Sequence, residues 1–163
     1  MIKDRHDFPA APSPPGQPLE LTFPAQSEWV SVVRLATAGV ASRMGFSYDE
    51  IEDIKLAIAE ACNNAILHAH PEKAGQMVRV QWLPCARHLE ISVIDSGSLE
   101  PHQLLLNDSS KELDELPEGG MGLLLIEALM DEVEQGTTPQ GNTVMRMIKR
   151  LSVDTRLEVG SLS

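Results

Sequence analysis

The sequence SYDEIEDIKLAIAEACNNAILHAH, which runs from Ser47 to His70, decides the fold. Ser47 with Glu50 three residues later is the pattern of a capping box, and Pro71 prevents the helix from continuing. Apolar residues recur at the spacing of one helix face, and these are Ile51, Ile54, Ile58, Ala61 and Ala65. The stretch therefore predicts one long helix that packs a single face on a β-sheet.

Two polar residues of this helix lie off the apolar face. Glu60 and Asn64 are one turn apart, and at about 100° per residue they project only about 40° from each other. Their neighbours around the helix are Leu56, Ala57 and Leu67, so we expect the two polar groups in apolar surroundings. Burial there is costly unless a ligand binds both groups, and a magnesium nucleotide with an attacking hydroxyl is one such ligand. The alternative is a solvated pair on an outer face of the helix.

The rest of the chain alternates between strand and helix patterns. Strands are expected where alternate residues are apolar, at 19–23, 77–82, 89–94, near Val133 and at 143–151. Helices are expected from Ser27, as the cap, to Gly45, and from Met121 to about Asp131. A long polar segment separates Asp95 from Gly120, and a turn is expected at 135–141. This order predicts a two-layer α/β sandwich rather than a doubly wound parallel sheet.

Composition limits what the protein can do. A chain of 163 residues, of which 42% are hydrophobic, suits one domain, expected at 19–151 between a mobile Pro-rich tail (1–18) and a C-terminal tail (152–163). No apolar run approaches the length of a membrane span, so a cytoplasmic protein is expected. The net charge of -11 argues against direct binding to nucleic acid. Cys62 and Cys85 have neither disulfide nor zinc-site spacing.

Two further motifs can carry ligand chemistry. Asp95 follows directly on the strand at 89–94, and beside Gly97 its carboxylate can accept a hydrogen bond from an exocyclic amine. The run EGGMG at 118–122 leads into a helix whose unpaired backbone N–H groups and dipole can hold phosphates without a lysine. By itself, each motif is also typical of an ordinary turn or helix entry.

In order and spacing these motifs resemble the Bergerat ATP-binding fold of the GHKL superfamily, which gyrase, histidine kinases and the heat-shock chaperone share. The similarity covers about residues 19–151 and is greatest to the anti-sigma-factor serine kinases. The matching segments are Arg34-Leu35, 39–45, 48–53, 60–65, 118–122 and 129–133. The resemblance implies a mixed, mostly antiparallel sheet covered on one face by three helices.

The resemblance also implies roles for individual residues. It makes Glu60 the general base that orients the acceptor serine hydroxyl, and Asn64 the only side-chain ligand of Mg²⁺. Asp95 is implied to recognise the adenine amino group, and Thr143 in the last strand to support the adenine end. Further contacts to ATP are implied at Asn63, Gly97, Gly119, Gly120, Met121, Gly122 and Leu123.

The function implied by the resemblance is an ATP- and Mg²⁺-dependent serine-protein kinase that acts as a homodimer. Such a protein sequesters a sigma factor and phosphorylates a serine of an anti-sigma-factor antagonist, which would otherwise displace it. One alternative is a non-catalytic module in which bound ATP only orders the site that grips a partner. Another is a histidine-kinase catalytic domain, which is disfavoured because no helices with an acceptor histidine precede the domain in this sequence.

Overall fold

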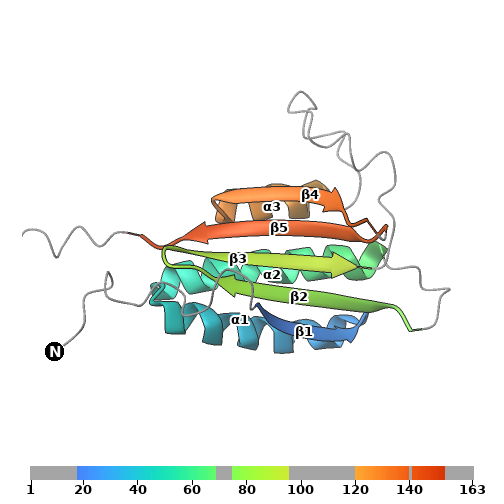
Figure 1. Cartoon of the computed structure of the whole chain (residues 1–163), viewed down its shortest axis with the longest axis horizontal. Coiled ribbons are helices and arrows are strands. Elements are labelled where there is room, and N and C mark those ends of the chain that lie inside the picture. The colour runs from blue at the N-terminus through green and yellow to red at the C-terminus, as the bar shows by residue number, and fades with distance from the viewer. Residues whose placement is uncertain (1–17, 69–74, 96–119, 140, 153–163) are drawn as a thin grey trace, which may run out of the picture.

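The computed structural model describes residues 18–68, 75–95, 120–139 and 141–152, which form a sheet with helices on one face. The strands are β1 (Leu19–Pro24), β2 (Met77–Pro84), β3 (His88–Asp95), β4 (Glu132–Thr137) and β5 (Thr143–Arg150). The helices are the 3-10 turn η2 (Ser27–Trp29), α1 (Val30–Met44), α2 (Tyr48–His68) and α3 (Gly120–Leu129). In Figure 1 the sheet faces the viewer and the helices lie behind it, which confirms the two-layer sandwich.

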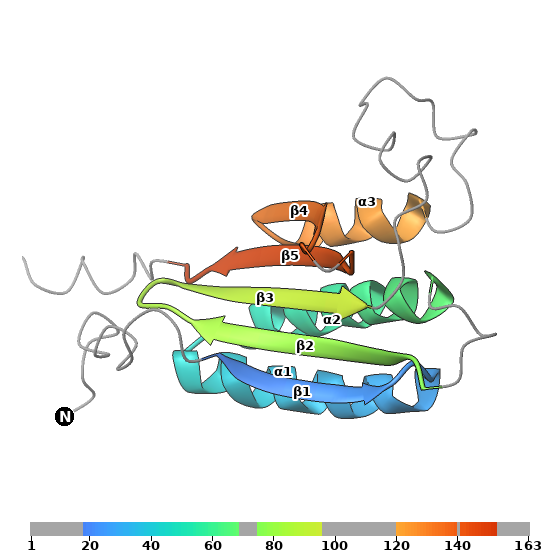
Figure 2. The ribbon, with the colours of Figure 1, turned by 45° about the vertical axis from the view of Figure 1, so that its right-hand side comes forward.

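The strand order is β1-β2-β3-β5-β4, and every pairing in the described strands is antiparallel. The expected mixed sheet is therefore corrected to an antiparallel one. The reason is the position of β5. Strands β3 and β4, on either side of α3, run in the same direction, but β5 lies between them and separates what would have been a parallel pair (Figure 2).

Helix α2 forms the centre of the core. Its buried residues are Ile54, Ala57, Ile58, Ala61, Cys62 and Ala65, whereas Ile51 is only partly buried. They pack with alternate residues of β2 and β3, which are Val78, Val80, Trp82, Leu89, Ile91 and Val93. The indole N–H of Trp82 donates to Thr37 Oγ1 (3.1 Å), and that hydroxyl donates to the carbonyl of Val33 (2.7 Å). The buried polar groups between α1 and β2 are thus paired.

The helix ends follow the predicted chemistry in two places and depart from it in one. The backbone N–H of Ser47 donates to Glu50 Oε2 (2.6 Å) and that of Glu50 to Ser47 Oγ (3.2 Å), which confirms the capping box. Gly45 ends α1 in the left-handed conformation, with φ of 88°, as predicted. The prediction that Ser27 caps the first helix is wrong. Ser27 is the first residue of the turn η2, and α1 starts only at Val30. The residue that precedes α1 is Trp29, whose side chain makes no capping hydrogen bond.

The remaining boundaries differ by a few residues. Helix α3 starts one residue before the expected position and ends at Leu129. Strand β4 continues to Thr137, into the expected turn, because Thr137 pairs with Thr143 across the hairpin. The predicted tails, 1–18 and 152–163, lie outside the described residues except for Pro18 and Ser152, and so does the segment 96–119. Ser152 donates hydrogen bonds to Glu50 Oε1. None of the described helices has the length and apolar character to cross a membrane.

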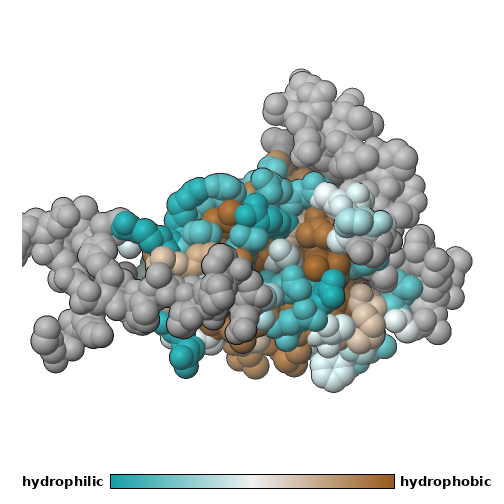
Figure 3. All heavy atoms as spheres, in the orientation of Figure 1, coloured by the Kyte–Doolittle hydropathy of each residue, from teal (hydrophilic) through white to brown (hydrophobic). Residues whose placement is uncertain are grey.

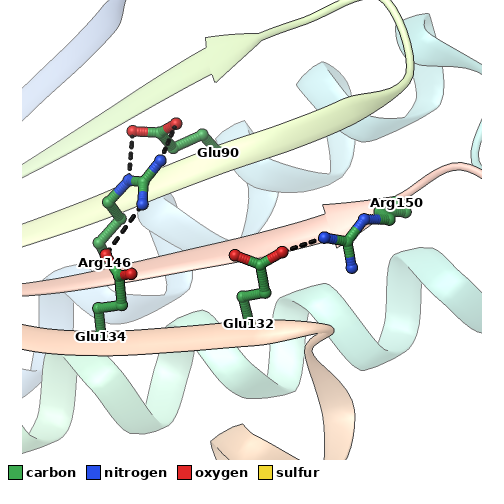
Figure 4. A network of polar contacts seen from close by, with 5 residues as sticks. All are labelled: Glu90, Glu132, Glu134, Arg146 and Arg150. Atoms are coloured by element: carbon green, nitrogen blue, oxygen red, sulfur yellow. Dashed lines mark hydrogen bonds and ion pairs between the residues drawn. The ribbon is translucent and has the colours of Figure 1, made fainter.

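The face of the sheet away from the helices carries charged side chains, and hydrophilic atoms gather over β4 and β5 in Figure 3. Arg146 on β5 pairs with Glu90 on β3 (2.8 Å) and with Glu134 on β4 (2.9 Å), while Arg150 pairs with Glu132 (Figure 4). The hydrogen bond from Arg146 lowers the pKa of Glu90, although partial burial opposes it. These pairs help to fix the register of β3, β5 and β4.

Candidate functional site

The structure brings Glu60 and Asn64 of α2 against the first turn of α3. A Cβ atom built on Gly122 would lie 3.1 Å from Glu60 Oε2 and 3.4 Å from Asn64 Oδ1. The carboxylate and the carboxamide therefore share one flank of α2, the flank that α3 covers. The order of the motifs along the chain gives no signal of this contact, because α2 and α3 are separated by two strands and a long segment.

The surroundings of this pair differ from the prediction. Of the three expected apolar neighbours, Ala57 is buried, but Leu56 is 43% exposed and Leu67 is 74% exposed. Glu60 and Asn64 are partly buried. The prediction of apolar surroundings is thus wrong for the two leucines, because they point outward from the helix layer and α3 supplies the cover instead.

A second pair of polar residues lies where β3 ends. Asp95 is the last residue of β3 and is only 7% exposed. Thr143 is directly opposite in β5, and its hydroxyl donates a hydrogen bond to Asp95 Oδ1. A carboxylate accepts several hydrogen bonds, so this donor uses part of its capacity. A buried carboxylate whose position is fixed by its neighbour is suited to recognise one donor group of a ligand.

The start of α3 presents backbone rather than side chains. Gly120 and Leu123 are buried, and Leu123 belongs to the hydrophobic core, while the side chain of Met121 points outward and is exposed. The first N–H groups of a helix have no partner within it, and the helix dipole adds positive potential there. This end of α3 lies against Glu60 and is suited to hold an anion.

Not every predicted site residue joins this arrangement. Asn63 is partly buried, and it does not supply any of the three atoms nearest to a Cβ built on Gly122, which belong to Glu60 and Asn64. Gly97 and Gly119 lie outside the described residues. The roles of all these residues toward ATP stay predictions.

The donor set near α3 also bears on a metal ion. Among the described residues, no three or more histidine, cysteine, aspartate or glutamate side chains are grouped so that they could hold a metal. Magnesium, however, usually keeps several waters and takes one or two protein oxygens together with phosphates. The carboxamide oxygen of Asn64, close to the start of α3, fits such a partial ligand set.

The fold and this site define the class of protein: a histidine kinase-like ATPase domain, whose family model matches residues 23–149. The serine-protein kinase RsbW of Bacillus thuringiensis is 43% identical over 143 residues, which cover 83% of this chain and 88% of that protein. RsbW of Bacillus anthracis gives the same values, and RsbW of Bacillus cereus strain Q1 is 44% identical. The chain belongs to the RsbW family of serine-protein kinases.

Solved structures support the fold. The RsbU and RsbW domains of a Mycobacterium tuberculosis protein match with a TM-score of 0.61 and 23% identity, over 85% of this chain and 33% of that chain. The mycobacterial sensor histidine kinase MprB matches with a TM-score of 0.51 and 15% identity, over 83% of this chain and 98% of that chain. At these identities the likeness is one of fold alone.

Proposed function

We propose that this chain uses ATP and Mg²⁺ to phosphorylate a serine of a small antagonist protein, and that as a homodimer in the cytoplasm it sequesters a sigma factor. The observation that carries the proposal is the contact of Gly122 in α3 with Glu60 and Asn64 in α2. In this contact a carboxylate, a carboxamide and the start of a helix lie side by side. Phosphoryl transfer needs mainly such positioning and charge neutralisation.

Glu60 is the general base that accepts the proton of the acceptor serine hydroxyl. Glu60 is only partly buried, and its carboxylate lies beside the start of α3, so a serine hydroxyl that approaches this end of the helix would donate its proton to the carboxylate. A general base must lie within hydrogen-bond distance of the hydroxyl that it activates. Glu60 would hold the hydroxyl in line with the phosphate that the start of α3 positions.

On the nucleotide side, the work is divided among three elements. Asn64 would contribute one oxygen to Mg²⁺, and the N–H groups at the start of α3 would hold phosphate oxygens. Asp95, held by Thr143, would accept a hydrogen bond from the adenine amino group. Bound ATP and Mg²⁺ supply the phosphoryl group and the positive charge that neutralises it during transfer.

The protein partners are proposed from the family. The relatives are serine-protein kinases, so a protein serine is the proposed acceptor. The sigma factor and its antagonist follow from the likeness to the anti-sigma-factor serine kinases. The net charge of -11 favours protein partners over nucleic acid.

The direct test is phosphate transfer to a serine. The protein is incubated with labelled ATP, Mg²⁺ and a candidate antagonist, and the phosphorylated residue is identified by mass spectrometry. Glu60→Gln keeps the shape of the side chain but cannot accept the proton, so transfer should fall by about 100-fold or more. Glu127→Gln is the matched control, since Glu127 is exposed on α3, and it should transfer at the wild-type rate.

The outcomes separate the kinase from a non-catalytic module. No serine phosphorylation by the wild type, or full activity in Glu60→Gln, contradicts the catalytic claim. A module that only grips a partner would bind ATP without transfer, and Asp95→Asn would then abolish partner binding while Glu60→Gln leaves it unchanged.

A further inference from the structure

The backbone conformation at residue 122 does not require a glycine. Gly122 lies in the first turns of α3, and the glycines with positive φ in the described residues are Gly45, Gly75 and Gly141. Alanine is more favourable than glycine in a helix, because glycine loses more conformational freedom on folding. The reason for a glycine at this position must therefore lie in what surrounds it.

What surrounds it is the pair of functional groups on α2. A Cβ at residue 122 would lie 3.1 Å from Glu60 Oε2, which is tighter than nine in ten contacts of real Cβ atoms, so the carboxylate would have to move by a few tenths of an ångström. The same Cβ would lie 3.4 Å and 3.5 Å from Asn64 Oδ1 and Nδ2, which are ordinary contact distances. An alanine would thus displace the Glu60 carboxylate but leave the Asn64 carboxamide in place.

Gly39 provides the contrast. It also lies in a helix, α1, without positive φ, but a Cβ built on it would meet nothing within 4 Å. An alanine at 39 should therefore only gain helix propensity. The difference between the two glycines isolates the contact with Glu60 from the general effect of adding a methyl group to a helix.

We infer that Gly122 is a positioning residue for Glu60: the missing side chain lets α3 lie directly on the carboxylate and sets where Oε2 stands relative to the acceptor hydroxyl. The backbone N–H of Gly122 can still contact a phosphate, but the effect of the missing side chain on the reaction is exerted through the position of Glu60. The catalytic part of this inference rests on the proposed function of Glu60. A carboxylate displaced by a fraction of an ångström is a poorer base for a hydroxyl held in a fixed position.

The inference predicts that Gly122→Ala lowers the kcat for serine phosphorylation but hardly changes the Kd for Mg-ATP. Gly122→Ala keeps the backbone N–H and leaves Asn64 in place, so the Kd for Mg-ATP should stay within about threefold of the wild-type value. The kcat for serine phosphorylation should fall about tenfold or more, since misplacing a reacting group by up to 1 Å can cost about 100-fold. Gly39→Ala should change neither quantity.

A double-mutant cycle shows whether the effect passes through Glu60. Glu60→Asp shortens the side chain and draws the carboxylate back from residue 122. In that background, Gly122→Ala should change the remaining kcat by less than about twofold. An equal loss in both backgrounds, or a loss of Mg-ATP affinity as large as the loss of kcat, would overturn the inference.

A readout without catalysis separates this inference from the proposed function. The ¹³C signal of the Glu60 side-chain carboxyl, assigned by its absence in Glu60→Gln, is compared in wild type, Gly122→Ala and Gly39→Ala without nucleotide. The signal should move in Gly122→Ala alone. If it does not move, or if Gly122→Ala does not fold, the positioning role is wrong. If it moves while the wild type transfers no phosphate, the proposed function has failed and the contact stands.

Discussion

Replacing Thr143 with valine tests how the buried Asp95 is held. Valine has the shape of threonine but no hydroxyl, so the substitution removes the donor to Asp95 Oδ1 and changes little else. A hydrogen bond to a charged group contributes about 1.5–3 kcal/mol, and its loss inside a protein leaves an acceptor that water reaches poorly. Because Asp95 is only 7% exposed but has another interaction, we expect the free energy of unfolding to fall by about 2 kcal/mol.

The measurement is urea denaturation of the nucleotide-free protein at pH 7. Thr137→Val is the matched control, because Thr137 pairs with Thr143 across the β4–β5 hairpin but is exposed. The control should change the free energy of unfolding by no more than about 0.5 kcal/mol. If Thr143→Val is as mild as this control, the bond does not hold Asp95, and the argument for a fixed carboxylate at the end of β3 fails.

The remaining predictions concern the capping box, the charged sheet face and a buried thiol. Partial burial raises the pKa of Glu50, but hydrogen bonds from Ser152 and Ser47 outweigh this effect and lower the pKa overall. Ionised Glu50 therefore stabilises the folded protein at pH values above its unfolded-state pKa, and this contribution is lost as the pH falls through the pKa of Glu50 in the folded protein. Ser47→Ala should lower the free energy of unfolding by about 1 kcal/mol at pH 7, and the stability difference between wild type and Glu50→Gln should shrink in acid titrations. Arg146→Met should cost about 1 kcal/mol at pH 7 by urea denaturation, with a smaller loss below the lowered pKa of Glu90; an unchanged midpoint would remove any role for the ion pairs. Burial raises the pKa of Cys62 to about 12, so iodoacetamide at pH 8 should modify it only after unfolding; rapid modification of the folded protein would contradict its burial.

Local sequence patterns were enough to predict most of the elements but not how they meet. The capping box and the helical spacing identified α2, and the alternation of residues identified β2 and β3, because both signals depend on neighbours along the chain. The position of β5 between β3 and β4 depends on which strands pair, and periodicity carries no information about partners.

The same holds for the candidate site: local patterns predicted residues on one helix, but not which other element contacts them. The spacing of Glu60 and Asn64 on one side of a helix followed from helix geometry, but their cover did not. Leu56 and Leu67 were expected to provide it, and the first turn of α3 does so instead. Residue periodicity reports which face of a helix is buried and not which element buries it. The resemblance gave Asp95 and Thr143 separate roles at the adenine, but the hydrogen bond between them was not predicted, because only the pairing of β3 with β5 brings them together.

The central claim is that α2, the end of β3 and the start of α3 together form one ATP site. Calorimetric titration of the full chain with Mg-ATP tests it most directly, using wild type, Asp95→Asn and Glu60→Gln. The account predicts that wild type and Glu60→Gln bind one ATP per chain with similar affinity, and that Asp95→Asn binds at least about 30-fold more weakly, since its amide cannot replace the carboxylate toward both Thr143 and adenine. Absence of binding by the wild type, or unchanged affinity in Asp95→Asn, would contradict it.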